Sequence, residues 1–244
     1  MELQGATALV TGSNRGLGRH FAMELLRRGA KVYATARRPE LVDVPGVEVL
    51  RLDITDPASV DAAAAAAGDV DVLINNAAYM TGGNLVSGDL ESIRLAMESS
   101  YFGTLSMIRA FAPVLARNGG GAVLNVLSGA AWQTVDGNTA YAAAKAAQWS
   151  LTNGVRLELA GQGTHVTALV PGMIDTEPMR AFAAEHGYEL PEGALEDPAH
   201  VVAQGLDGLE GREVEVVQGF AVHAKAALAG PPRALDPGAL DGAA

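Results

Sequence analysis

Cysteine is absent from this chain of 244 residues, which excludes disulfides, thiolate metal sites and cysteine nucleophiles. Basic residues are also few: 17 lysines and arginines stand against 28 aspartates and glutamates, so the formal net charge is −11. Nucleic acids and anionic membranes are bound by basic faces, so we expect neither as a partner. An anionic ligand would need a local cluster of cations, and Arg15, Arg37 and Arg38 are the candidates.

Long hydrophobic runs are missing as well. No stretch of about 18 apolar residues occurs, so no transmembrane helix is expected. The first residues lack the positive segment and the apolar stretch of a secretory signal peptide, and we therefore expect a cytoplasmic protein. Apolar residues make up 49% of the chain and charged residues 18%, which is typical of a globular protein with a full core.

Strand-like and helix-like patterns alternate along most of the chain. Apolar runs predict strands at 6–10, 31–36, 47–51, 70–75, 121–127 and 165–170. The segments between them predict helices at 16–28, 57–67, 89–117 and 141–160. Because the strands are apolar without strict alternation, we expect a sheet covered on both faces. This pattern predicts an α/β protein with a doubly wound, mostly parallel sheet of the Rossmann type, in a single domain.

The pattern is less regular after Gly172. We predict helices at 177–186, 198–209 and 221–228, a loop at 189–198 and a last strand at 213–217. The sequence from Gly230 onward is rich in glycine, proline and alanine. We therefore assign residues 1–229 to the domain and predict a frayed tail at 230–244.

A glycine-rich segment joins the first predicted strand to the first predicted helix. It reads Thr11-Gly12-Ser13-Asn14-Arg15-Gly16-Leu17-Gly18. Glycines let the backbone approach a pyrophosphate, and the following helix N-terminus offers free N–H groups and a positive dipole end. The spacing Gly-x-x-x-Gly-x-Gly differs from the usual Gly-x-Gly-x-x-Gly, so the segment alone indicates dinucleotide binding only weakly.

Ser128, Tyr141 and Lys145 form a second group that could carry chemistry. Tyr141 and Lys145 are four residues apart and share one helix face, and Ser128 follows a strand at the sheet edge where ligands bind. A tyrosine has a pKa of roughly 10, and a nearby ammonium group would lower that pKa. A Tyr-x-x-x-Lys pair alone is common on helix surfaces. Its position after the glycine segment and Ser128 favours a catalytic interpretation.

With these segments, further features make the chain resemble a classical short-chain dehydrogenase/reductase. They are Asp53 after a strand, the stretch Asn75-Asn76-Ala77-Ala78, the spacing from Ser128 to Tyr141, and Pro171-Gly172 with Thr176. The resemblance extends over about residues 6–176. It implies a nicotinamide cofactor and hydride transfer between that cofactor and a carbonyl group or secondary alcohol.

The resemblance also implies residue roles. Tyr141 would be the general acid for carbonyl reduction and the base for alcohol oxidation. Lys145 would lower the pKa of Tyr141 and hold the nicotinamide ribose, and Ser128 would orient the substrate oxygen. Asp53 would contact the adenine and Thr176 the carboxamide. The whole implied cofactor-binding set is Gly12, Ser13, Asn14, Arg15, Gly16, Leu17, Gly18, Arg37, Arg38, Asp53, Ile54, Asn75, Ala77, Tyr141, Lys145, Pro171, Gly172, Ile174 and Thr176.

The chain departs from the family pattern in the predicted helix 89–117. The family's asparagine stands three residues before a glycine, and Gly103 places Ser100 at that position. The asparagine normally holds a water that connects the lysine to solvent, and serine is shorter. We count Ser100 among the catalytic candidates and expect either another route for the proton or a low rate.

The end of the second strand predicts which dinucleotide is bound. NAD-preferring members usually carry an acidic residue there, but this chain has Ala36, followed by Arg37 and Arg38. Guanidinium groups suit a phosphate by charge and by geometry. We therefore predict NADP(H) as the cofactor, and we predict no metal.

We expect the segments after Ala78, Ser128 and Gly172 to line the substrate pocket. Methionines and aromatic residues in such segments could equally belong to the core. The nominated residues are Tyr79, Met80, Trp132, Gln133, Met173, Met179 and Phe182. Their character predicts a medium-sized, largely apolar ketone or alcohol as the small-molecule partner. The leading hypothesis is a carbonyl reductase or alcohol dehydrogenase. An epimerase or dehydratase on the same fold and a non-catalytic NADP-binding sensor remain alternatives.

Small and apolar residues on the helices 89–117 and 141–160 bear on assembly. The second helix contains Ala142, Ala143, Ala146 and Ala147. The resemblance implies that these helices pair across a two-fold axis, so we predict a homodimer. A homotetramer is possible, but the last strand lacks the glycines that many tetrameric members carry there.

Overall fold

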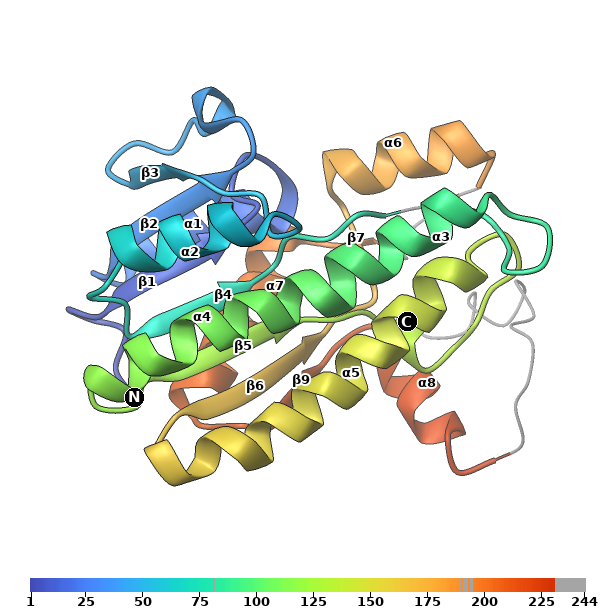
Figure 1. Ribbon diagram of the computed structural model, residues 1–244. Coiled ribbons are helices and arrows are strands. Elements are labelled where there is room, and N and C mark those ends of the chain that lie inside the picture. The colour runs from blue at the N-terminus through green and yellow to red at the C-terminus, as the bar shows by residue number, and fades with distance from the viewer. Residues whose placement is uncertain (81, 189, 191–192, 194, 231–244) are drawn as a thin grey trace.

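The computed structural model describes residues 1–80, 82–188, 190, 193 and 195–230. The predicted tail therefore lies, apart from Gly230, outside the described residues. The main feature of the fold is a seven-stranded parallel sheet with the strand order β3-β2-β1-β4-β5-β6-β9 (Figure 1). The strands are β1 (Thr7–Thr11), β2 (Lys31–Ala36), β3 (Glu48–Arg51), β4 (Val72–Asn75), β5 (Ala122–Val126), β6 (His165–Val170) and β9 (Glu215–Val217).

Helices lie on both faces of this sheet. They are α1 (Gly16–Arg27), α2 (Pro57–Ala66), α3 (Leu90–Met97), α4 (Thr104–Arg117), α5 (Thr139–Leu159), α6 (Glu177–His186), α7 (Pro198–Glu210) and α8 (Phe220–Ala227). Figure 1 shows α2, α4 and α5 in front of the sheet and α1 and α7 behind it. The predicted doubly wound α/β fold is confirmed, and no helix within the described ranges is long and apolar enough to cross a membrane.

Strand β1 shows why its sequence does not alternate between apolar and polar residues. Ala8 and Val10 belong to the core cluster that contains Phe21 of α1, whereas Leu9 belongs to the cluster that contains Phe111 of α4. All three strand residues are fully buried. Because both faces of the sheet are covered by helices, the three central positions of the strand are all apolar.

The predicted helix 89–117 is in fact divided into three parts. A π-helical turn, Glu98–Gly103, separates α3 from α4. Such a turn inserts an extra residue into the helix, and here it buries Ser99 and Ser100. The Ser99 hydroxyl accepts a hydrogen bond from Tyr79 N at 3.1 Å, which ties the turn to the segment after β4.

A second, small sheet lies inside a region predicted without strands. The two-residue strands β7 (Met173–Ile174) and β8 (Leu195–Glu196) pair in parallel. They bring the segment after β6 against the end of the segment predicted as a loop at 189–198. Pairs this short carry little periodicity, which explains why the sequence did not indicate them.

The order of the strands determines where a ligand can bind. Chain connections run outward in one direction from β1 to β3 and in the other from β4 to β6 and β9. Loops at the carboxyl ends of β1 and β4 therefore diverge and leave a crevice between them. The glycine-rich segment follows β1 at this crevice.

Candidate active site

The glycine-rich turn between β1 and α1 lets a ligand come close to its backbone. Gly12 and Gly16 have φ angles of +72° and +53°, which favour glycine. A Cβ atom on Gly18 would overlap the Gly12 carbonyl oxygen and lie 2.6 Å from Asn76 Nδ2. No side chain caps the first turn of α1, whose N-cap is Arg15, so its N–H groups are available to a ligand.

The segment after β4 is fastened to this turn. Thr11 Oγ1 accepts hydrogen bonds from Asn76 N and Ala77 N, both at 2.9 Å. Asn76 Nδ2 donates to the Thr11 carbonyl oxygen at 2.9 Å. Asn76, which was quoted in the motif but not assigned a role, therefore fixes the two sides of the crevice relative to each other.

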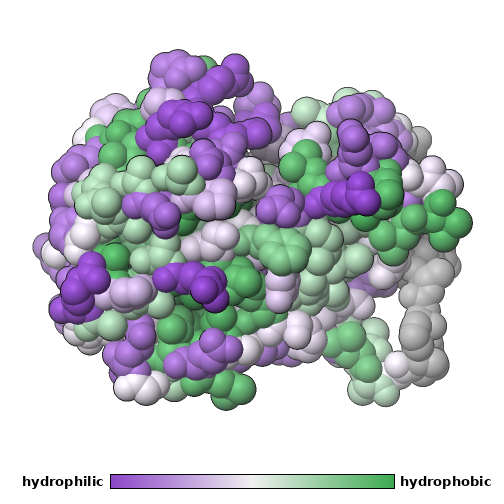
Figure 2. Space-filling view, viewed as in Figure 1, coloured by the Kyte–Doolittle hydropathy of each residue, from purple (hydrophilic) through white to green (hydrophobic). Residues whose placement is uncertain are grey.

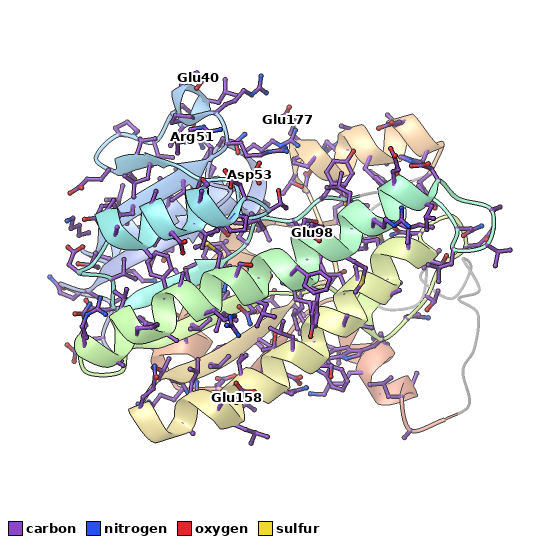
Figure 3. The ribbon with its side chains drawn as sticks, viewed as in Figure 1. Glu40, Arg51, Asp53, Glu98, Glu158 and Glu177 are labelled. Carbon is purple, nitrogen blue, oxygen red and sulfur yellow. The ribbon has the colours of Figure 1, made fainter. Side chains whose placement is uncertain are left out.

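A continuous cavity of about 1230 Å³ extends from this turn to helix α6. Figure 3 shows Asp53 beyond the end of β3 and Glu177 at the start of α6, and both residues line the cavity. It also contains most of the predicted site: Gly12, Asn14, Arg15, Gly16, Leu17, Arg37, Arg38, Asp53, Ile54, Ala77, Tyr79, Met80, Ser128, Gln133, Tyr141, Lys145, Pro171, Gly172, Met173, Ile174, Thr176, Met179 and Phe182.

Three residues predicted to bind the cofactor do not line the cavity. The Ser13 hydroxyl is fully buried and donates to the Val10 carbonyl oxygen at 2.9 Å. Gly18 packs against the turn itself. Asn75 is the last residue of β4, and its Nδ2 donates to Asn125 Oδ1 of β5 at 2.9 Å. These residues shape the turn and the sheet from inside, because their side chains or Cα atoms face the core.

Trp132 and Ser100 are also placed differently from the prediction. Trp132 packs edge-to-face against Trp149 of α5, with ring centroids 6.0 Å apart, and belongs to a core cluster behind the site. Ser100 is fully buried in the π-helical turn, and its Oγ has no hydrogen-bond partner among the described residues. Neither side chain lines the cavity.

Further residues that the sequence did not indicate also line the cavity. They include Asp136, Asn138, Glu185, Tyr188, Leu190 and Phe220. Contacts between distant loops bring them there: Gly83 N donates to the Gly137 carbonyl oxygen at 2.6 Å, and Tyr188 Oη donates to the Asp136 carbonyl oxygen at 3.0 Å. Such long-range contacts leave no local pattern in a sequence.

The predicted catalytic group comes together at one wall of this cavity. Ser128 directly precedes a short 3-10 turn, Gly129–Ala131, and its Oγ accepts a hydrogen bond from Ala130 N at 3.2 Å. Tyr141 lies in the first turn of α5, and Lys145 lies one turn later. The Lys145 Nζ atom is 5.7 Å from the centre of the Tyr141 ring.

Burial shifts the pKa values of both titratable groups. Burial raises the pKa of Tyr141 to about 12, although a hydrogen bond with Ser128 acts in the opposite direction. Burial also lowers the pKa of Lys145 to about 7, so that near neutral pH this amine carries only part of its charge. Desolvation is therefore the largest influence on both groups, and the effect of Lys145 on the pKa of Tyr141 stays a prediction.

The opposite end of the cavity is cationic. Arg15, Arg37 and Arg38 line it with exposed side chains, and none of them takes part in an ion pair within the described ranges. Ala36, the last residue of β2, is buried and brings no carboxylate to this end. Asp53 Oδ1 accepts hydrogen bonds from Thr55 N and Thr55 Oγ1, at 3.0 and 2.7 Å, and thereby orders the turn before α2.

The segment after β6 forms the wall nearest to α6. Thr176 is the N-cap of α6, and its Oγ1 accepts a hydrogen bond from Met179 N at 3.4 Å. Gly172 N donates to Glu196 Oε2 of β8 at 3.0 Å, and burial raises the pKa of this carboxyl group. Glu196 was not predicted, since its contact with Gly172 depends on the pairing of β7 with β8.

These features fit a dinucleotide cofactor. The turn leaves room for a pyrophosphate beside the N-terminus of α1, three arginines line the same end, and the cavity continues to Ser128, Tyr141 and Lys145. No group of three or more metal-ligating side chains occurs in the described part of the chain.

Comparison with known proteins gives consistent results. The family model described as short chain dehydrogenase matches residues 6–186. A sorbitol dehydrogenase from Cereibacter sphaeroides is 36% identical over 206 residues, which cover 79% of this chain and 80% of that protein.

Solved structures extend the likeness to three dimensions. A short chain dehydrogenase from Burkholderia cenocepacia, crystallised in complex with NADP, is 38% identical, with a TM-score of 0.84 and 94% of each chain covered. A 3-ketoacyl-(acyl-carrier-protein) reductase from Brucella melitensis, complexed with NADH, is 26% identical, with a TM-score of 0.79; the match covers 88% of this chain and 97% of that one. Similar proteins therefore bind either dinucleotide.

Proposed function

Since this chain belongs to the short-chain dehydrogenase family, we propose that it is an NADP(H)-dependent oxidoreductase acting on a carbonyl group or a secondary alcohol. The observation that carries the proposal is the single cavity that joins two ends of different chemistry. Ser128, Tyr141 and Lys145 line one end, and Arg37 and Arg38 line the other. When bound, the dinucleotide supplies or accepts the hydride.

The residues of the chain handle the proton. In carbonyl reduction the Tyr141 hydroxyl donates its proton to the substrate oxygen, which Ser128 holds by a hydrogen bond. Because the pKa of Tyr141 is raised to about 12, this group is protonated at neutral pH and is ready to act as the acid. In alcohol oxidation Tyr141 must instead accept a proton, and the charge of Lys145 assists that direction.

The preference for NADP(H) rests on charge. Ala36 puts no carboxylate at the end of β2, and the guanidinium groups of Arg37 and Arg38, which form no ion pair with any described residue, suit a 2′-phosphate. The 38% identical protein from Burkholderia cenocepacia was crystallised with NADP, which supports the same choice.

The substrate end favours an uncharged molecule of moderate size. Met80, Met173, Met179 and Phe182 supply apolar surface there. Among the described residues, the cations that line the cavity are Lys145 and the three arginines at the cofactor end, so this part of the chain offers none to a substrate carboxylate or phosphate. The similarity to a sorbitol dehydrogenase supports a secondary alcohol or ketone as the reacting group.

Cofactor titrations test the proposal. We expect Arg37→Ala to weaken NADPH binding by about 10- to 100-fold, because a charge-assisted phosphate contact is worth about 1.5–3 kcal/mol, and to change NADH binding little. Arg117→Ala is a matched control, since Arg117 ends α4 at the other edge of the sheet and does not line the cavity. Equal weakening of both dinucleotides would mean that Arg37 has only a structural role.

A substrate panel tests the reaction itself. Purified protein is incubated with NADPH and a series of ketones, and with NADP⁺ and the matching alcohols, while the absorbance of the reduced nicotinamide is followed. Turnover is expected for neutral ketones with aliphatic or aromatic bulk. Tight NADPH binding without turnover across a wide panel would instead favour a non-catalytic sensor of the cofactor.

A further inference from the structure

The amine of Lys145 is held by two neutral oxygens. Its Nζ donates hydrogen bonds to the Val126 carbonyl oxygen at 3.0 Å and to Gln148 Oε1 at 2.8 Å. Lys145 is only 2% exposed and Gln148 only 1%. The lysine therefore depends on these two oxygens for the hydrogen bonds that water would otherwise provide.

Gln148 is fixed in this position from its other side. Its Nε2 donates to Thr104 Oγ1 of α4 at 2.9 Å, so both ends of the buried amide are used. This connection assigns the oxygen, because only one orientation of the amide lets it accept from Lys145 and donate to the threonine. Lys145, Gln148 and Thr104 thus form a chain of hydrogen bonds from α5 to α4.

Ser100 cannot provide the same support. It lies in the π-helical turn one helical turn before Thr104, and its Oγ makes no hydrogen bond to any described residue. The family resemblance would place an asparagine at this position. This chain has a short side chain where that amide is expected, and it has a different buried amide in contact with the lysine.

We propose that Gln148 is a positioning residue for Lys145 and replaces the support that an asparagine at position 100 would give. This inference rests on the proposed dehydrogenase function of the site. Gln148 does not line the cavity. It acts by accepting a hydrogen bond from the ammonium form of Lys145, and it stabilises the charge that assists Tyr141.

The groups that face Lys145 make the sign of the effect clear. The Val126 carbonyl of β5 and the Gln148 amide are neutral, and the Thr104 hydroxyl of α4 that contacts Gln148 is neutral too; Tyr141 on the same helix is the titratable neighbour. Burial is what lowers the pKa of Lys145, and no carboxylate opposes it. An acceptor such as Gln148 Oε1 favours the charged amine, so its removal should lower this pKa further.

Lysine NMR measures this directly. The chain has only the lysines Lys31, Lys145 and Lys225, so ¹³C labelling of lysine gives three signals, and Lys31 and Lys225 serve as internal references. We expect Gln148→Leu to lower the pKa of Lys145 by about one pH unit or more, the equivalent of one lost hydrogen bond to a charged group. Gln148→Glu should shift it in the opposite direction and keeps an acceptor if the leucine variant does not fold.

Activity supplies a second readout. Because oxidation needs the Tyr141 phenolate, Gln148→Leu should move the rise of alcohol oxidation with pH to more alkaline values, and it should affect ketone reduction less. The double variant Ser100→Asn/Gln148→Leu should recover part of the shift. If the pKa of Lys145 is unchanged in both Gln148→Leu and Gln148→Glu, the proposal is wrong. The NMR titration needs no substrate, so it remains decisive even if the proposed reaction is wrong.

Discussion

At the scale of single residues, the active-site chemistry depends on groups that burial keeps uncharged. A raised pKa of Tyr141 and a lowered pKa of Lys145 both favour the neutral forms, so the pair lies ready to donate a proton and poorly prepared to accept one. In the proposed reaction, this arrangement suits the step in which Tyr141 donates a proton to a carbonyl oxygen.

Tyr141→Phe tests the acid directly. The substitution removes only the hydroxyl, so we expect turnover to fall by about 10²–10⁴-fold, the usual contribution of a general acid, while NADPH binding persists. Steady-state rates and a fluorescence titration measure the two effects. Tyr33→Phe is the matched control, because the Tyr33 hydroxyl bonds to Asp69, away from the cavity. Near wild-type turnover in the Tyr141 variant would refute the assignment.

Residue spacing predicted which residues lie together better than it predicted which side chains line the cavity; the catalytic roles stay predictions. Tyr141 and Lys145 were predictable because a helix fixes the direction of residues four positions apart. Asn75 and Trp132 were misplaced because their orientation depends on context. Asn75 turns toward β5 inside the sheet, and Trp132 packs on Trp149. A sequence motif gives the position of such a residue in the chain, but it does not give the direction of its side chain.

At the scale of elements, the seven strands of the main sheet were predicted within two residues at each end, whereas β7 and β8 were not predicted. Strands β1, β2, β4, β5 and β6 are mostly buried, and buried parallel strands are continuous apolar runs. The helix from 89 to 117 shows what a sequence hides. Its apolar pattern runs through the π-helical turn, so nothing in it marks the break. A reason for the break lies elsewhere in the chain: a Cβ on Gly103 would come within 2.8 Å of Ile54 Cδ1, so the turn is packed tightly on the segment after β3.

The β1–α1 turn gives a prediction at this scale. We expect Gly18→Ala to destabilise the protein by about 1–3 kcal/mol, because the new methyl group would overlap the Gly12 carbonyl oxygen and displace the Asn76 amide. NADPH binding should weaken at the same time, since the turn carries the phosphate site. Gly68→Ala is the control, because a Cβ there meets nothing within 4 Å. Denaturant unfolding measures the stability of both variants, and a titration measures their affinity for NADPH. Equal stability and equal affinity of Gly18→Ala and Gly68→Ala would contradict the prediction.

At the scale of the whole molecule, the site is assembled from segments distant in the sequence. The turn after β1, the segment after β4, helix α5 and helix α6 all contribute to one cavity. The alternation of strands and helices predicted the sheet, and the sheet order places these segments at one edge. The closing loops around residues 82–88 and 133–138 were not predictable, because hydrogen bonds such as Asn84 Nδ2 to Asp136 Oδ1 join residues far apart in the chain.

The surface in front of the sheet bears on assembly. Figure 2 shows apolar side chains on the face formed by α4 and α5. Large exposed apolar residues there include Phe102 of the π-helical turn, at 48% exposure, and Leu157 of α5, at 80%. Side chains of this size rarely remain in water when they share a patch, and a two-fold axis lets one patch cover itself.

We therefore predict a dimer through α4 and α5. Light scattering at micromolar concentration should give a mass of about twice the 25.1 kDa of the chain. Leu157→Glu should shift the population toward monomer, because it places like charges on both sides of a two-fold interface. Val49→Glu, at a similarly apolar but 41% exposed position on β3, should leave the mass unchanged. A mass near that of one chain for the unmodified protein would contradict the prediction, whereas a dimer insensitive to Leu157→Glu would move the interface to another face.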